Sequence, residues 1–334
     1  MLTHSPCIWF GPVSTVPSWH WVGADVAERM KRWLPVRYFE DITELPDKAL
    51  VFWIKRPGNN RAARAVRQKK LRVVFFPVDC FSDSENIAEH RAFIDSARLV
   101  SLHARSLAPY FPKAELAYVD HYNKYGVKHQ DRMPGNRYLW VGAFQYVPYV
   151  LQAIEHFRSI GNVLLLSDQD RPNAWAAAKV NAARIGVDHF EKHLVKPGVE
   201  LVTWSEESQR AALLTCRAAF DAKYEGCFNQ RHKPPTKMQK YLCSGIPCAI
   251  NERVALREQL AHEVANLSQL TDNAGNAEYL RRLALYSVEL SSELSLDNVA
   301  NSYLRLAKLL SPEVAHLEEP AMLPSQIYES RLSA

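Results

Sequence analysis

The chain of 334 residues is long enough for roughly two domains, each able to bury its own core. Hydrophobic residues make up 47% and charged residues 23% of it, which excludes a fibrous or intrinsically disordered protein. The net charge of +5, from 41 basic and 36 acidic residues, favours local basic patches over a surface that coats nucleic acid.

The first 120 residues alternate short β-type runs with amphipathic helical stretches. Strands are expected at residues 7–11, 36–40, 49–54, 72–78, 97–102 and 114–119. Helices are expected at residues 23–34, 59–70 and 85–96. This alternation predicts an α/β fold with a mostly parallel sheet and helices on its faces.

A polar segment rich in turn formers, DHYNKYGVKHQDRMPGNR, interrupts the pattern, and a second α/β series follows it. We therefore predict an N-terminal domain over residues 1–120, a linker over 121–137 and a C-terminal domain over 138–300. A C-terminal helix and tail cover 301–334, and the tail after Pro312 is expected to be loosely ordered or to cover a surface.

The elements of the second series are also predicted from periodicity. Strands are expected at residues 138–144, 162–167, 199–204, 218–223 and 247–251. Helices are expected at residues 147–160, 174–186, 207–216, 276–292 and 295–310. Ligands of open α/β sheets bind outside the carboxyl ends of the strands, so we expect a cleft between the two domains.

The six cysteines show no C-x-x-C pair and no spacing typical of a disulfide scaffold, so we expect reduced thiols, mostly in the core. The beginning of the chain, MLTHSPCIWFGPV, lacks a basic region followed by a long apolar one. No run approaches about eighteen uninterrupted apolar residues. These features predict a cytoplasmic protein.

The segment RHKPPTKMQKYLCSGIPCAIN, residues 231–251, combines dense positive charge with the start of a helix. Thr236 followed by Gln239 is a capping-box pattern, which predicts a helix from near Lys237 that ends at Gly245. A helix N-terminus surrounded by basic side chains suits a phosphate or diphosphate. The alternative is a surface helix with a solvent-exposed lysine face.

Residues 202–223, VTWSEESQRAALLTCRAAFDAK, and 233–251, KPPTKMQKYLCSGIPCAIN, resemble the donor-binding half of GT-B glycosyltransferases. The resemblance extends over residues 138–255 and is weaker in the first half, where RVVFFPVDCF is similar to an element of acceptor domains. It implies two Rossmann-like domains facing a cleft, with C-terminal helices that cross back. It also implies a nucleotide-diphosphate sugar as co-substrate, with neither a metal nor a further cofactor.

The resemblance implies a donor site near the carboxyl ends of the second set of strands. Its predicted residues are Gly142, Arg171, Glu225, Arg231, Lys233, Thr236, Lys237 and Lys240. Many retaining relatives carry a glutamate at the place of Lys240 and another eight positions earlier, where this chain has His232. Many relatives also carry a basic residue just after the glycine that corresponds to Gly142. In this chain Arg171 is the candidate substitute, and the alternative is that Arg171 is a surface loop residue.

Catalysis on this pattern requires stabilisation of the leaving diphosphate and, in inverting enzymes, a base for the acceptor hydroxyl. The candidate bases are His20, Asp79 and His103, all at predicted strand ends. Trp19 and Trp21 are expected either to stack on a sugar or to pack at the domain interface.

Residues 55–72 contain eight basic side chains and no acidic one. They predict either weak peripheral contact with an anionic membrane or a solvated helix packed on the sheet, and the small apolar face favours the helix.

The sequence as a whole predicts a glycosyltransferase, retaining or inverting, with an unidentified acceptor that is a glycan, a lipid-linked glycan, a protein or a nucleic acid. One alternative is an inactive GT-B module that binds a nucleotide, a glycan or a protein partner. Another is a sugar-nucleotide isomerase or hydrolase that uses Glu225, Asp168 or Asp170.

Overall fold

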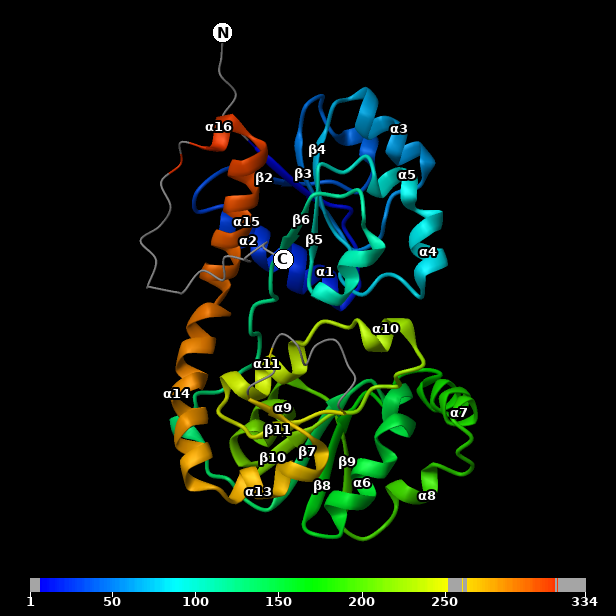
Figure 1. The fold of residues 1–334 in the computed structure, drawn as a ribbon, viewed down its shortest axis with the longest axis vertical. Helices are drawn as coiled ribbons and strands as arrows, with labels where there is room; N and C mark the ends of the chain where they lie inside the picture. The colour runs from blue at the N-terminus through cyan, green and yellow to red at the C-terminus, as the bar shows by residue number, and fades with distance from the viewer. Residues whose placement is uncertain (1–6, 252–259, 261–262, 316, 318–334) are drawn as a thin grey trace.

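The computed structural model describes residues 7–251, 260, 263–315 and 317. Two parallel sheets, each with six strands among these residues, form two lobes stacked one above the other (Figure 1). The N-lobe contains the first sheet and the C-lobe the second. Residues 121–136 of the predicted linker lie between the last strand of the first sheet and the first strand of the second, and Arg137, its last residue, begins that strand.

The N-lobe sheet has the strand order β2-β1-β3-β4-β5-β6, and all its pairs are parallel. Its strands are β1 (Ile8–Gly11), β2 (Val36–Tyr38), β3 (Leu50–Ile54), β4 (Arg72–Phe76), β5 (Leu99–Leu102) and β6 (Leu116–Tyr118). Its helices are α1 (Pro17–Trp19), α2 (Asp25–Met30), α3 (Asn60–Gln68), α4 (Ser84–Glu89) and α5 (Arg91–Ile94). A π-helical stretch, His20–Ala24, joins α1 to α2, and 3-10 turns cover Ile42–Glu44 and Arg105–Tyr110.

The C-lobe sheet has the order β12-β11-β10-β7-β8-β9, which is the Rossmann order of third, second, first, fourth, fifth and sixth strand read from β9. Its strands are β7 (Arg137–Gly142), β8 (Asn162–Ser167), β9 (Val199–Thr203), β10 (Ala218–Phe220), β11 (Cys248–Ala249) and β12 (Val264–Ala265). Its helices are α6 (Leu151–Arg158), α7 (Ala174–Arg184), α8 (Glu191–Leu194), α9 (Glu206–Thr215), α10 (Phe228–Arg231), α11 (Thr236–Cys243) and α13 (Leu270–Gly275). Further 3-10 turns cover His129–Asp131, Phe144–Val150 and Leu267–Gln269.

Both sheets are covered on both faces, which explains why their strands read as nearly continuous apolar runs. Every residue of β3 is buried, and separate apolar clusters lie on the two sides of each sheet. Local capping fixes where helices begin. Asn59 accepts hydrogen bonds from two backbone N–H groups of α3, and Ser205 forms a capping box at the start of α9.

The C-terminal helices connect the two lobes, with α14 (Ala277–Glu293) along the C-lobe and α15 (Leu296–Leu310) along the N-lobe (Figure 1). The ring of Tyr303 on α15 stacks on Phe76 at 4.6 Å, and its hydroxyl donates to the Val22 carbonyl at 3.0 Å. Asp297 pairs with Arg29 of α2. The last helix, α16 (Pro312–Ala315), follows, and residues 318–334 of the predicted tail lie outside the described residues.

The structure confirms the predicted α/β fold with two facing lobes and helices that cross back. Some local predictions were wrong. His90 separates α4 from α5 within the single helix expected at 85–96, and a 3-10 turn occupies the first part of the helix expected at 147–160. β12 was not predicted, because two residues are too few to show a period.

Candidate functional site

The strand order of the C-lobe sheet reverses between β7 and β10, and in sheets of this type the strand ends at such a topological switch point border the ligand-binding crevice. Gly142 ends β7, and Asp221 directly follows β10. The N-terminus of α11 reaches the same place, because Lys237 on its first turn contacts both positions. The sequence therefore brings one glycine, one acid and one lysine together at this crevice.

Asp221 is the centre of a buried charge cluster that we call the Asp221 cluster, made of Asp221, Lys223, Lys237 and Trp140. Its carboxylate is 2% exposed and lies 2.7 Å from Lys223 Nζ and 3.1 Å from Lys237 Nζ. Trp140 Nε1 donates to the same carboxylate at 3.0 Å, and Lys237 Nζ lies 4.8 Å from the Trp140 ring centre. Two ammonium groups thus share one carboxylate, which leaves a net positive charge when all three are ionised.

Gly142 leaves the space that Lys237 occupies. A Cβ atom at this position would lie 2.5 Å from the Trp140 ring and 2.9 Å from Lys237 Nζ. Any larger residue would displace the ammonium group or the ring. The glycine predicted at the donor site is therefore required mainly by the packing of the Trp140 ring, with Lys237 next to it.

Burial decides the direction of the pKa shift at Lys237, whereas charge attraction decides it at Asp221. Burial lowers the pKa of Lys237 to about 7, and Asp221 only partly opposes this effect. Burial raises the pKa of Asp221, but Lys223 and Lys237 outweigh it and hold that pKa well below its usual range. Protein surrounds the Lys237 side chain closely, but 23% of its surface remains exposed. A ligand can therefore reach it. An anion there would favour the ammonium form of Lys237.

Lys240 does not lie on a solvent-exposed lysine face. It is 7% exposed, and its Nζ donates to Gln209 Oε1 at 3.0 Å. The same atom lies 5.7 Å from the ring centre of Trp21 in the N-lobe and 5.6 Å from that of Tyr125 in the linker. Trp21 therefore packs at the interface between the lobes, whereas Trp19 is buried against Gly23 and is not available to a sugar.

The capping box predicted at Thr236 is also absent. Thr236 is the first residue of α11, and Pro235 precedes it without a side-chain cap. Gln239 Nε2 instead donates to Asp120 Oδ1 at 3.0 Å, across the interface between the lobes. The helix ends as expected, with Gly245 in the left-handed region at φ +64°.

The other predicted donor residues are spread along the crevice. Lys233 Nζ lies 4.9 Å from the Tyr146 ring centre, and its charge contributes to the lowered pKa of Lys237. Asn251 donates to Glu225 at 3.2 Å, and Arg231 is exposed on α10. Arg171 is 73% exposed and lies 3.8 Å from Asp168, so the structure leaves its role a prediction.

The two further acids considered for isomerase or hydrolase chemistry support loop structure. Asp168 Oδ1 accepts a hydrogen bond from the Phe144 backbone N–H at 2.7 Å. Asp170 accepts one from the Thr203 hydroxyl. Both carboxylates hold neighbouring strand-end loops together, which accounts for their presence without a catalytic role.

In the N-lobe, polar residues follow successive strands at the edge that faces the C-lobe. Lys55 follows β3, Asp79 follows β4 and His103 follows β5. Lys55 Nζ lies 2.7 Å from Asp79 Oδ1. Burial raises the pKa of Asp79. The charge of Lys55 and its hydrogen bond lower it by more, so the pKa lies below its usual value. Asp79 is therefore an ionised carboxylate held by a lysine.

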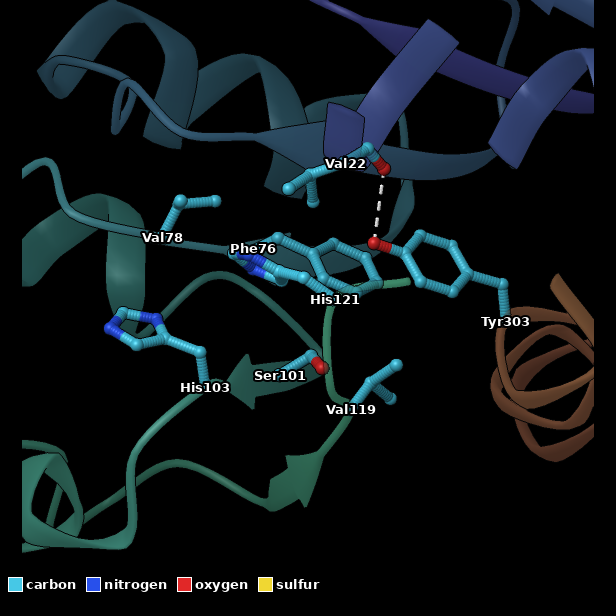
Figure 2. Close-up of a pocket in the computed structure, with 8 residues that line it drawn as sticks. All are labelled: Val22, Phe76, Val78, Ser101, His103, Val119, His121 and Tyr303. Carbon is cyan, nitrogen blue, oxygen red and sulfur yellow. Dashed lines mark hydrogen bonds between the residues drawn. The ribbon is translucent and has the colours of Figure 1, made fainter. Parts of the chain in front are cut away.

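His103 is buried and neutral. Its Nε2 lies 2.7 Å from the backbone carbonyl of His232, and burial lowers its pKa to about 4. Because a carbonyl only accepts hydrogen bonds, Nε2 carries the proton of the neutral ring. His103 and His121 line a cavity about the size of one water molecule, between strand ends of the N-lobe and Tyr303 of α15 (Figure 2). His20, the third predicted base, is exposed in the helical stretch before α2.

The segment around α10 joins the two lobes at this edge. Asn229 Nδ2 donates to the Asp79 carbonyl at 2.8 Å, and the Ser106 hydroxyl lies 2.8 Å from His232 Nδ1. The same segment continues directly into Lys233 and Lys237. The nine residues from Asn229 to Lys237 therefore connect the neighbours of Asp79 and His103 with the predicted donor residues Lys233 and Lys237.

The basic segment 55–72 does not form one charged patch. Lys69 donates to three backbone carbonyls, and Arg72 pairs with Glu313 at 2.8 Å. Arg61, Arg64 and Arg67 remain exposed on α3. No helix in the described part of the chain is long and apolar enough to cross a membrane.

Among the described residues, no group of three or more His, Cys, Asp or Glu side chains is placed to hold a metal ion. The six cysteines are free, and Cys216, Cys243 and Cys248 are buried.

Solved structures resemble this arrangement of two Rossmann-like lobes. An α,α-trehalose-phosphate synthase (UDP-forming) from Burkholderia vietnamiensis superposes with a TM-score of 0.58 at 8% identity, over 81% of this chain and 75% of that one. AviGT4, a glycosyltransferase involved in avilamycin A biosynthesis, gives a TM-score of 0.51 at 13% identity, over 93% and 98%. This chain has the GT-B fold.

The GT-B fold is shared with other activities. A UDP-N-acetylglucosamine 2-epimerase from Rickettsia bellii superposes with a TM-score of 0.50 at 8% identity, over 91% of this chain and 96% of that one. No protein-family model matches the sequence, and no curated protein matches it either. The fold alone therefore does not determine which reaction this chain performs.

Sequence reasoning missed Asp221, Lys223 and Lys55. Each is a charged residue that follows a buried strand within three positions, a signal that was present in AAFDAK and ALVFWIK. Asp221 and Lys223 pair with each other two positions apart, but the contacts of Asp221 with Lys237 and of Lys55 with Asp79 join separate strands and helices, which the sequence does not show. Trp140 was missed because an indole inside a strand reads only as core.

Proposed function

We propose that this protein is a glycosyltransferase that transfers a sugar from a nucleotide-diphosphate sugar without a metal ion. The observation that supports this most directly is the position of Lys237, on the first turn of α11, beside Gly142 at the switch point of the C-lobe sheet. Ligands of Rossmann-like sheets bind at such switch points. The N-terminus of α11 adds a partial positive charge there.

The chemistry that the crevice supplies is stabilisation of a leaving diphosphate. Negative charge grows on the diphosphate as the glycosidic bond breaks, and preorganised ammonium groups stabilise it without reorganisation. Lys237 is held in place by Asp221 and Trp140, and Lys233 lies on the same approach. In this proposal, these side chains and the N-terminus of α11 together supply electrostatic catalysis.

We propose that the acceptor binds at the facing edge of the N-lobe, where Asp79 and His103 follow β4 and β5. Burial lowers the pKa of His103 to about 4, and Lys55 holds the pKa of Asp79 below its usual value, so the neutral imidazole is the stronger base of the two. We therefore assign His103 as the preferred base if the reaction inverts configuration, and Asp79 as a ligand for acceptor hydroxyls.

A panel of nucleoside diphosphates and their sugars tests the donor site by thermal shift and by transfer or hydrolysis assays. At least one donor should stabilise the wild type, and Lys237→Ala should abolish that shift. Lys192→Ala is the matched control, because Lys192 is exposed on α8, which precedes β9 and lies away from the carboxyl edge.

The result also separates the two classes of function. If no nucleotide shifts the wild type, the donor site is refuted. If a nucleotide binds through Lys237 but neither transfer nor hydrolysis occurs with any donor, the protein is a binding module on the GT-B fold.

A further inference from the structure

Lys240 lies three residues after Lys237 on α11, about 4.5 Å further along the helix axis. The two lysines have different surroundings. Lys237 contacts Asp221, whereas the Lys240 ammonium contacts Gln209 and two aromatic rings. Within the described ranges, no aspartate or glutamate forms an ion pair with Lys240. It is a buried cation without a carboxylate partner.

Two further N–H groups beside Lys240 have no hydrogen-bond acceptor. Trp21 Nε1 and Gln209 Nε2 are both buried without a partner among the described residues. The Gln209 amide cannot simply be turned over, because its Oε1 accepts from both Lys240 Nζ and Trp204 Nε1 at 3.0 Å. Donors therefore outnumber acceptors at this place.

Such a surplus of buried donors is costly unless an acceptor arrives. An unpaired buried N–H group costs about 1–3 kcal/mol, and an unpaired buried charge costs more. Burial lowers the pKa of Lys240 to about 8, so the amine is still mainly protonated at neutral pH. The complementary ligand group is a compact anion that accepts several hydrogen bonds, such as a carboxylate or a phosphate.

Aromatic side chains form the walls around these donors. Tyr125 lies between Trp21 and Trp204, with ring centres 6.3 Å and 6.2 Å away. Trp204 is 37% exposed, so this wall reaches the surface at the carboxyl end of β9. Low-polarity walls strengthen the attraction between an ammonium group and an anion.

We propose that the Lys240 cluster, made of Lys240, Gln209, Trp21, Tyr125 and Trp204, binds a second anionic group of the ligand whose diphosphate lies against Lys237. This inference rests on the proposed function and narrows its substrate class to donors that carry a carboxylate or an additional phosphate. The anion accepts hydrogen bonds from Lys240 and from Gln209 Nε2 or Trp21 Nε1. An uncharged donor leaves these groups unpaired.

Matched ligand pairs test the inference and identify the source of the anion. One pair is UDP-glucose and UDP-glucuronate, which differ by a carboxylate on the sugar. The other is adenosine 5′-diphosphate and its 3′-phosphorylated form, which differ by a phosphate on the ribose. In titration calorimetry, the wild type should bind the more acidic member of at least one pair about tenfold more tightly, as expected for a charged hydrogen bond.

Substitutions separate this cluster from the diphosphate site. Lys240→Met should remove the preference for the acidic member while leaving the affinity for the other member within about twofold. Lys237→Met should weaken both members alike. Equal binding of both members of each pair by the wild type, or a preference that Lys240→Met retains, overturns the inference and leaves Lys240 as a contact between the lobes.

A second measurement does not depend on nucleotide binding. Malonate and pyrophosphate are titrated against the wild type, Lys240→Met and Lys240→Gln, and thermal stability is recorded. If the nucleotide panel fails but one of these anions stabilises the wild type more than either variant, the Lys240 cluster is an anion site, whereas the proposed function and the nucleotide-sugar ligand class fail. If no nucleotide binds and neither anion distinguishes the wild type from the variants, the inference fails too.

Discussion

Replacing Lys240 by methionine should stabilise the protein at neutral pH. Burial lowers the pKa of Lys240 from 10.5 to about 8, so the folded state binds the proton less readily than the unfolded state. The cost of burying the charge is fully present below about pH 8 and disappears as the pH rises towards 10.5. This cost lowers the free energy of unfolding by about 3 kcal/mol at pH 7 and by about 1 kcal/mol at pH 9.5.

The substitution also removes favourable contacts. The hydrogen bond to Gln209 is worth about 1 kcal/mol, and the contacts with the Trp21 and Tyr125 rings are worth about 1 kcal/mol together. Gln209 Oε1 keeps its bond from Trp204, so no acceptor is orphaned. We therefore expect Lys240→Met to raise the free energy of unfolding by about 1 kcal/mol at pH 7.

Urea unfolding of the wild type and Lys240→Met, followed at pH 7 and at about pH 9.5, measures this effect. The stability difference between the two proteins should change by about 2 kcal/mol in favour of the wild type at the higher pH. A variant that is destabilised by more than about 1 kcal/mol at pH 7, or a difference that does not depend on pH, would refute the reasoning.

Three further predictions concern the Asp221 cluster. Asp221→Asn should lower the free energy of unfolding in urea by about 3 kcal/mol, because it leaves buried ammonium groups without their counter-charge. A loss below about 1 kcal/mol would contradict this prediction. Nucleotide affinity, measured by calorimetry, should fall as the pH rises above about 7, because Lys237 loses its proton there. Lys237→Met should show no such fall, and a parallel fall in both proteins argues against the role of the amine. Gly142→Ala should lower the free energy of unfolding by about 1–3 kcal/mol and weaken nucleotide binding, because its Cβ meets Trp140 and Lys237. The control Gly275→Ala, whose Cβ meets nothing closer than 3.8 Å, should be neutral in both assays.

The sequence predicted the sheets well, because buried parallel strands are recognisable from their own residues. All six strands of the N-lobe lie within the predicted runs, and the segment from Pro247 contains β11. Helix ends depend on contacts that sequence does not show. Thr236 and Gln239 match a capping box, but Pro235 precedes the helix and Asp120 takes the Gln239 side chain.

The candidate site was predicted in part. The α/β alternation indicated a parallel sheet, but the strand order that brings Lys237 to Gly142 comes from the structure. Helical periodicity placed Lys240 on the polar side of α11, but that side is covered by Trp21 from a different lobe. Contacts between residues more than two hundred positions apart are set by how the lobes pack, and local patterns carry no information about them.

The central claim is that a nucleotide diphosphate binds at the start of α11. The most direct measurement is a crystal structure of the protein with the nucleoside diphosphate that stabilises it most. We predict phosphate oxygens within about 3 Å of Lys237 Nζ, in the crevice between the ends of β7 and β10. A diphosphate bound elsewhere, with Lys237 still paired only with Asp221, would contradict the claim.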